Sequence, residues 1–199
     1  MLKGAFKVKY VLFLALTLLS VFAHSEWIVD TESSHVGFAS VKNETIAENH
    51  RLSGLTGSVS ADGAARVEID LATVETLVPI RNERIREILF DVDNFPSATI
   101  QTNLDMEQIN SISSGETQGL RIPLSIGLKS VKISKSVMVN VVRSGENVYD
   151  VASADPIMIR ASDFSLLKGI KTLQEMAGLQ SIEPVVPVTF NLRFIEKLL

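Results

Sequence analysis

The side chains that could do chemistry in this sequence are few, and their spacing does not bring them together. Three histidines occur, His24, His35 and His50. Neither His35 nor His50 has an Asp or Glu at metal-ligand spacing on a shared element. A metal site usually needs three or four protein ligands, and without cysteine no thiolate can contribute. The pattern predicts no metal site.

The sequence also lacks the motifs that assemble a nucleophile, a base or a phosphate cradle. It has no Gly-x-Ser-x-Gly elbow, no P-loop and no dinucleotide-binding glycine pattern. The remaining polar cluster is basic: Arg81, Arg84 and Arg86 alternate with Glu83 and Glu87. Such alternation is usual on a solvated, salt-bridged helix face. We predict no catalytic residues and a protein that is not an enzyme.

The first 25 residues have the pattern of a secretory signal peptide. Three lysines precede an apolar run at residues 10–22, and the small residues Ala23 and Ser25 precede a cut before Glu26. The run is shorter than the roughly 20 apolar residues of a membrane-spanning helix, so no stable membrane anchor is expected. We predict a signal peptide at residues 1–25, one domain at residues 26–199, and an exported protein.

Composition excludes further classes of partner. The net charge of −4 becomes more negative once the three lysines of the signal peptide are removed, which argues against a nucleic-acid partner. The absence of cysteine excludes disulfides and acylation at an N-terminal cysteine. A single domain of this length can bury enough surface to fold without disulfides.

Short segments of period-2 hydrophobicity dominate the rest of the chain and predict β-strands. Apolar residues alternate with polar or small residues most clearly at residues 67–71, 122–128, 133–141 and 188–194. Weaker strand patterns lie at residues 34–41, 46–55, 98–104, 148–154 and 156–161. One apolar face per strand suits an antiparallel sheet that is wetted on its other side.

Two segments change to a helical period. Ile85, Ile88 and Leu89 form an apolar face in a charged segment that should end before Asp93-Asn94-Phe95-Pro96. The second helix has Leu166, Ile170, Leu173 and Ala177 on one face, with Ser162 or Asp163 as N-cap and Gly178 as C-cap.

Eight or nine strands and two short helices predict an all-β domain. Its edges can be removed by closure into an eight-stranded antiparallel barrel. The lumen of such a barrel is either filled by side chains or holds one slender ligand. Composition does not decide between these two.

The whole domain resembles the YceI-like family. Residues 81–100 carry its charged helix followed by Phe90-Asp91-Val92 and Phe95-Pro96. Residues 27–35, 156–164 and 186–192 are similar to its opening strand, its late strand with an Asp-Phe turn, and its closing strand. The chain departs from the family pattern at Lys129 and Ser165, near turns where glycine is frequent.

This resemblance implies a lipocalin-like barrel that is periplasmic or secreted, and several members bind polyisoprenoids or relatives of isoprenoid quinones. We therefore expect a soluble exported carrier of a long isoprenoid-type lipid, an amphiphilic ligand held in the lumen. No cofactor is expected beyond such a bound isoprenoid or quinone-like molecule. Since some members are dimeric, a homodimer is also expected.

The predicted ligand site follows from the inward faces of the strands. We expect the lumen to be lined by Phe38, Ile69, Leu71, Ile100, Leu124, Ile126, Val139, Phe190 and Leu192. Arg81 and Arg84 are candidates to bind the head group at the barrel mouth. Ordinary core packing and a solvated helix face are the competing interpretations.

Two other functions fit the same pattern. The first is a fully packed stress or interaction module without a lipid ligand. The second is an outer-membrane β-barrel, although aromatic residues make up 6 % of the chain, few for two interfacial girdles.

Overall fold

The computed structural model describes residues 26–197, so the predicted signal peptide at residues 1–25 lies outside the described residues. The described part forms one sheet of eleven strands. The strands are β1 (Glu26–Val29), β2 (His35–Lys42), β3 (Ile46–Leu52), β4 (Leu55–Val59), β5 (Ala64–Asp70), β6 (Ser97–Asn103), β7 (Thr117–Leu128), β8 (Val131–Gly145), β9 (Val148–Ser153), β10 (Ile157–Arg160) and β11 (Val185–Lys197).

Eight of these strands close into an antiparallel barrel. The path runs β1-β4-β5-β6-β7-β8-β9-β11, and β1 closes it by pairing with β11 as well as with β4. Trp27 marks the closure, since it stands opposite Val59 on one side and Glu196 on the other. The predicted eight-stranded antiparallel barrel is confirmed.

The remaining strands continue the wall at one end without closing it. β2 and β10 pair with the first half of β11, and β3 pairs with β2. The single strand predicted over residues 46–55 is wrong, because it breaks between β3 and β4. Gly54 adopts a φ of 65° there, and the Thr73 hydroxyl bonds both the N–H and the carbonyl of Ser53. These bonds replace ladder bonds at the break.

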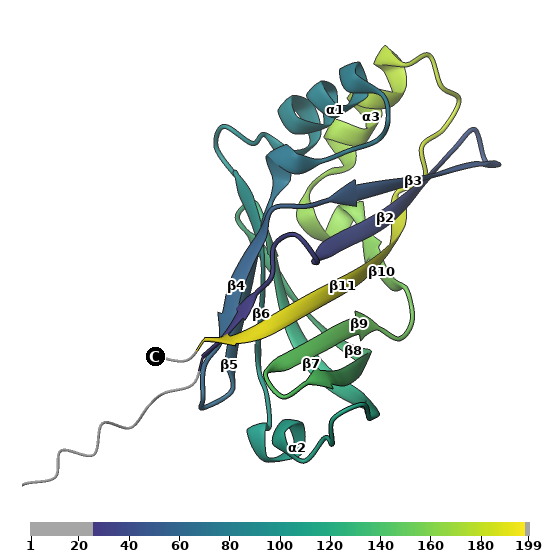
Figure 1. The fold of residues 1–199 in the computed structure, drawn as a ribbon. Coiled ribbons are helices and arrows are strands. Elements are labelled where there is room, and N and C mark those ends of the chain that lie inside the picture. The colour runs from purple at the N-terminus through teal and green to yellow at the C-terminus, as the bar shows by residue number, and fades with distance from the viewer. Residues whose placement is uncertain (1–25, 198–199) are drawn as a thin grey trace, which may run out of the picture.

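Short helices gather at the two ends of the barrel (Figure 1). At one end, α1 (Pro79–Arg84) runs into the π-helical turn η2 (Ile85–Phe90), and α3 (Leu167–Met176) packs beside η2. The single turns η1 (Leu71–Thr73) and η3 (Ala161–Phe164) lead into these segments. At the opposite end lies α2 (Met106–Asn110). No helix among residues 26–197 is long and apolar enough to cross a membrane.

Both predicted helices exist, and the first ends before Asp93 as expected, but the second begins after a different residue than predicted. The first ends at Phe90 because Asp91 is left-handed with a φ of 55°, five residues before Pro96. Neither Ser162 nor Asp163 caps α3, since both lie in η3 and Leu166 precedes the helix. Gly178 has the left-handed φ of 62° expected after a helix end.

The two departures from the family pattern both fall at left-handed backbone. Lys129, in the turn between β7 and β8, has a φ of 55°, and Ser165 after η3 has a φ of 58°. A side chain in this conformation costs roughly 1–2 kcal/mol relative to glycine. Both turns keep the left-handed conformation that glycine would favour, although the side chains of Lys129 and Ser165 make it less stable.

Candidate functional site

Two apolar cavities lie inside the barrel. The lower cavity, next to α2, has a volume of about 90 Å³. The upper cavity, beneath α3 and η3, has a volume of about 190 Å³. Almost all of the surface that faces either space is carbon. The alternation of each strand produces this result, because every second side chain points to the same face.

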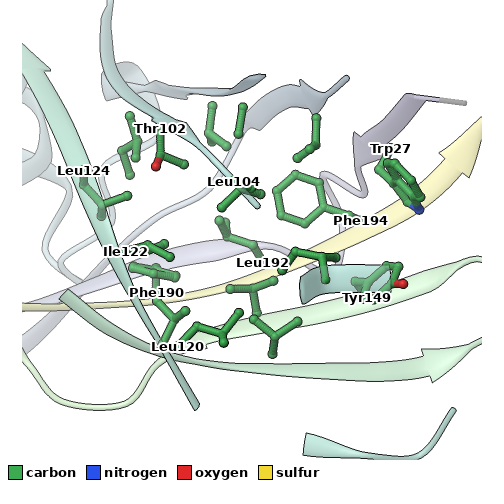
Figure 2. A pocket seen from close by; sticks show the side chains of 18 of the residues that line it. Trp27, Thr102, Leu104, Leu120, Ile122, Leu124, Tyr149, Phe190, Leu192 and Phe194 are labelled. Carbon is green, nitrogen blue, oxygen red and sulfur yellow. The ribbon is translucent and has the colours of Figure 1, made fainter. Parts of the chain in front are cut away.

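The lower cavity is enclosed by the closed ring of strands. Figure 2 shows its side chains around one space, with Trp27, Tyr149 and Phe194 at one end and Leu124 at the other. The Trp27 and Tyr149 rings meet edge to face with centroids 6.1 Å apart. Ile109 of α2 also lines this cavity. The space is therefore bordered by strands and, at its end, by a short helix.

The upper cavity has a mixed wall. Strand residues such as Val36 and Ile126 form one part, and helical segments supply Phe90, Phe164 and Ile170. Phe164 is 1 % exposed and anchors η3 in the wall. By contrast α3 has no buried residue. We refer to η3 and α3 (residues 161–176) as the lid of the upper cavity.

Three side chains line both cavities: Ile100, Leu124 and Phe190. Leu124 and Phe190 are 4 % and 5 % exposed. Because they belong to both walls, the two cavities adjoin across these three side chains. The lumen thus holds two apolar cavities that share these three side chains as a common wall.

Every residue predicted to line the lumen borders one of these cavities. Val139 and Leu192 border the lower one, and Ile100, Leu124 and Phe190 border both. The upper cavity is bordered by Phe38, Ile69, Leu71 and Ile126. The structure brings the predicted set together, and their contact with a ligand stays a prediction.

The predicted head-group residues have a different position. Arg81 donates from Nη1 to Glu48 Oε2 at 2.7 Å and from Nη2 to the Thr76 carbonyl. Within residues 26–197, Arg84 makes no hydrogen bond or ion pair with another side chain. Neither arginine borders either cavity. Arg81 is therefore tied to the barrel wall, and head-group binding by both residues stays a prediction.

Sequence reasoning missed a polar cluster on β2 and β3. His50 is 6 % exposed, and its Nε2 lies 2.7 Å from the Ser40 hydroxyl. Burial, followed by the charge of Arg81, lowers the pKa of His50. Glu48 bridges Lys42 Nζ at 2.9 Å and Arg81, and the hydrogen bond from Lys42 is the main cause that lowers its pKa. The register of β2 against β3 brings these residues together, and their spacing in the sequence does not predict that register.

The helical residues of the upper wall were also missed as lining. Leu166 and Ile170 were recognised as one helix face, and Phe164 as part of the Asp-Phe turn. Their position over the lumen follows from the packing of α3 on η2, which period alone does not give. Across residues 26–197, no three His, Asp or Glu side chains gather as a metal would require.

A closed antiparallel barrel with an apolar lumen and a helical lid defines a binding domain of the lipocalin-like class. The chain belongs to the YceI-like family, since the model of the YceI-like domain matches residues 27–194. A search of the curated proteins found no match.

Two solved structures illustrate the likeness. A polyisoprenoid-binding domain from Saccharophagus degradans, implicated in plant cell wall breakdown, is 31 % identical with a TM-score of 0.84. The match covers 86 % of this chain and 98 % of that one. BcnA from Burkholderia cenocepacia is 18 % identical with a TM-score of 0.62, and the match covers 83 % of this chain and 98 % of BcnA. The second likeness concerns the fold alone.

Proposed function

We propose that this protein is an exported carrier that holds one long isoprenoid-type lipid along its lumen. The observation that carries the proposal is the pair of adjoining apolar cavities, lined by the predicted residues. Each methylene group that leaves water contributes about 0.8 kcal/mol, so affinity should grow with chain length until the lumen is filled. The polyisoprenoid-binding domain from Saccharophagus degradans supports this class of ligand.

The cavity volumes set a condition on binding. An engineered cavity of about 150 Å³ in another protein holds one benzene molecule, so the 190 Å³ of the upper cavity suits a few isoprene carbons at most. A long chain must therefore widen the lumen. Within the lid, α3 is the part that can move, because it has no buried residue to hold it, whereas Phe164 anchors η3.

Family and interior both favour a carrier over the competing functions. The YceI-like fold is that of a family of binding domains that are in general periplasmic, which agrees with the predicted export signal. A transmembrane barrel faces lipid with apolar residues and has a polar interior, whereas this interior is apolar. The homodimer expected from the family resemblance stays a prediction.

The test is to purify the exported protein from a periplasmic extract without detergent. Native mass spectrometry with organic extraction should find a mass excess that resolves to a polyprenyl or quinone-like species. Bare protein from both native and recombinant sources would contradict the carrier and favour a packed interaction module. Retention in the outer-membrane fraction would instead favour the membrane barrel.

A further inference from the structure

The segment that leads into α1 exposes four apolar residues in succession. Leu77 is 86 % exposed and Ile80 is 52 % exposed, and Val78 and Pro79 between them are also exposed. Single exposed apolar residues are common on protein surfaces, whereas a continuous run is unfavourable in water unless a partner covers it. We call residues 77–80 the apolar tip. The tip leads into α1, which lies at the same end of the barrel as α3 of the lid (Figure 1).

Hydrogen bonds hold the tip in its exposed position. Leu77 has a left-handed φ of 62°, and its N–H donates to a carboxylate oxygen of Glu75. The same oxygen accepts a hydrogen bond from Asn82 Nδ2, and Asn82 Oδ1 accepts hydrogen bonds from the N–H and the hydroxyl of Thr76. Thr76 and Asn82 are both buried. The fold therefore keeps a leucine in an unfavourable backbone conformation and in contact with water, which indicates a role for the exposed side chain.

The apolar tip is too small for a stable protein–protein interface. Such an interface takes about 20–30 residues from each side, and its central side chains fill pockets on the partner. A bilayer needs no matching surface, so a few protruding apolar side chains can enter the boundary between head groups and acyl chains. Residues 76–80 also carry no charge that would have to leave water. These features select a lipid surface as the partner.

The distribution of charge favours approach to a membrane by the same end. Over α1 and η2, residues 79–90, three arginines stand against two glutamates. Glu75, which precedes the tip, is engaged in the hydrogen bonds of the loop. At the opposite end of the barrel, residues 105–116 around α2 include three acidic residues and no basic one. An anionic membrane surface should therefore repel the α2 end more strongly than the end that carries the tip.

We propose that the apolar tip docks reversibly on a phospholipid bilayer and holds the lid end of the barrel against it. The choice of a lipid surface rests in part on the proposed carrier function, because a long isoprenoid chain dissolves poorly in water and has to come from a membrane. Docking at this end brings the lid and the upper cavity beneath it close to the bilayer. Because the tip has only four residues, the protein can also leave the membrane again.

Sedimentation with phospholipid vesicles measures docking without any isoprenoid. Protein from a periplasmic extract is mixed with vesicles of phosphatidylcholine, or of phosphatidylethanolamine with phosphatidylglycerol. The double variant Leu77→Ser/Ile80→Ser should bind either vesicle at least about tenfold more weakly than wild type, since two apolar side chains no longer leave water. Ile28→Ser/Ile195→Ser is the matched control, because these two exposed residues lie opposite each other on β1 and β11, away from the tip. The control should bind as wild type does.

Leu77→Gly separates docking from folding. Glycine favours the left-handed conformation of residue 77, so this variant should keep or raise the urea midpoint of unfolding while it weakens vesicle binding. A lowered midpoint together with unchanged vesicle binding would overturn the role given to this leucine.

Three further outcomes would overturn the docking itself. The first is a wild type that stays in the supernatant with both kinds of vesicle, and the second is an equal loss of binding in the two double variants. The third is a dimer in analytical ultracentrifugation that the tip variant abolishes while vesicle binding is absent, which would assign the tip to a second copy of the chain. Protein that sediments with vesicles but carries no lipid in native mass spectrometry would support the docking and contradict the carrier function.

Discussion

The two ends of the lumen are built in different ways. Around the lower cavity every strand pairs on both sides, and Trp27, Tyr149 and Phe194 are all buried. Around the upper cavity β10 pairs with β11 alone, and the wall is completed by the lid. A closed ladder opens only by breaking many hydrogen bonds together, whereas a short helix can open locally. For the proposed carrier, this difference predicts that the ligand enters at the upper end and that its tail lies at the lower end.

The lid is fitted closely despite its exposure. A Cβ placed on Gly169 of α3 would lie 3.0 Å from the Ile88 carbonyl oxygen and 3.2 Å from Leu89 Cδ1. This close approach lets α3 rest on η2 without burying a large side chain. In this position α3 covers the upper cavity, and it can still move away from the barrel.

The largest expected effect lies at the junction of the two cavities. Phe190→Ala should lower the free energy of unfolding by about 3–5 kcal/mol, since it removes a buried ring. Urea unfolding measures this change. Phe95→Ala is the control, because Phe95 is partly exposed beneath Lys129 Nζ at 5.3 Å and should lose less buried area. Equal costs would mean that the junction is not packed as described.

The difference in local stability between the two ends should be visible in amide hydrogen exchange. Amides of α3 should exchange at least about a hundredfold faster than those of β7 and β8, because unfolding α3 alone breaks few buried contacts. Mass spectrometry of peptides after exchange measures both regions in one sample. Equal protection of lid and ladder would contradict entry at the upper end.

The sequence predicts some of the features behind these two expectations and not others. Strand period identified the inward residues, including Phe190, but the same pattern describes packed core and cavity wall alike. α2 has five residues, too few for a helical period to show, and the break at Gly54 depends on the distant Thr73. The cluster of His50 with Arg81 depends on strand register and on the position of α1. The periodicity of the sequence does not predict such contacts between distant segments.

Substitutions of two alanines can test the contribution of each cavity to ligand binding separately. Ala98 borders the upper cavity and Ala65 the lower. Ala98→Leu should weaken binding of the short alcohol geraniol about tenfold, because it fills volume that the chain would occupy, while Ala65→Leu leaves it unchanged. The longer solanesol should be weakened by both. Competition titrations measure this pattern, and a geraniol affinity reduced by Ala65→Leu alone would reverse the proposed order of filling.

The smallest effect concerns pH at the upper rim. Burial lowers the pKa of His50 in the folded state, so the unfolded chain binds more protons below about pH 6.5, and stability should fall as the pH drops through that value. His35 contributes in the same direction. His50→Phe should therefore flatten the stability profile between about pH 7.5 and pH 5 relative to wild type. An unchanged slope in urea unfolding would show that His50 is not held neutral by burial.

The most direct test of the account uses Trp27, the one tryptophan of the chain, which borders the lower cavity. Along β11, Val188 lies opposite Phe38 and Glu196 lies opposite Trp27, a run of about 26 Å at 3.3 Å per residue. Isoprenoid alcohols brominated at the end of the chain should quench Trp27 fluorescence when they are as long as solanesol, and not when they are as short as geraniol. Quenching by geraniol, or none at any length, would contradict a single chain that runs from the upper rim to the lower cavity.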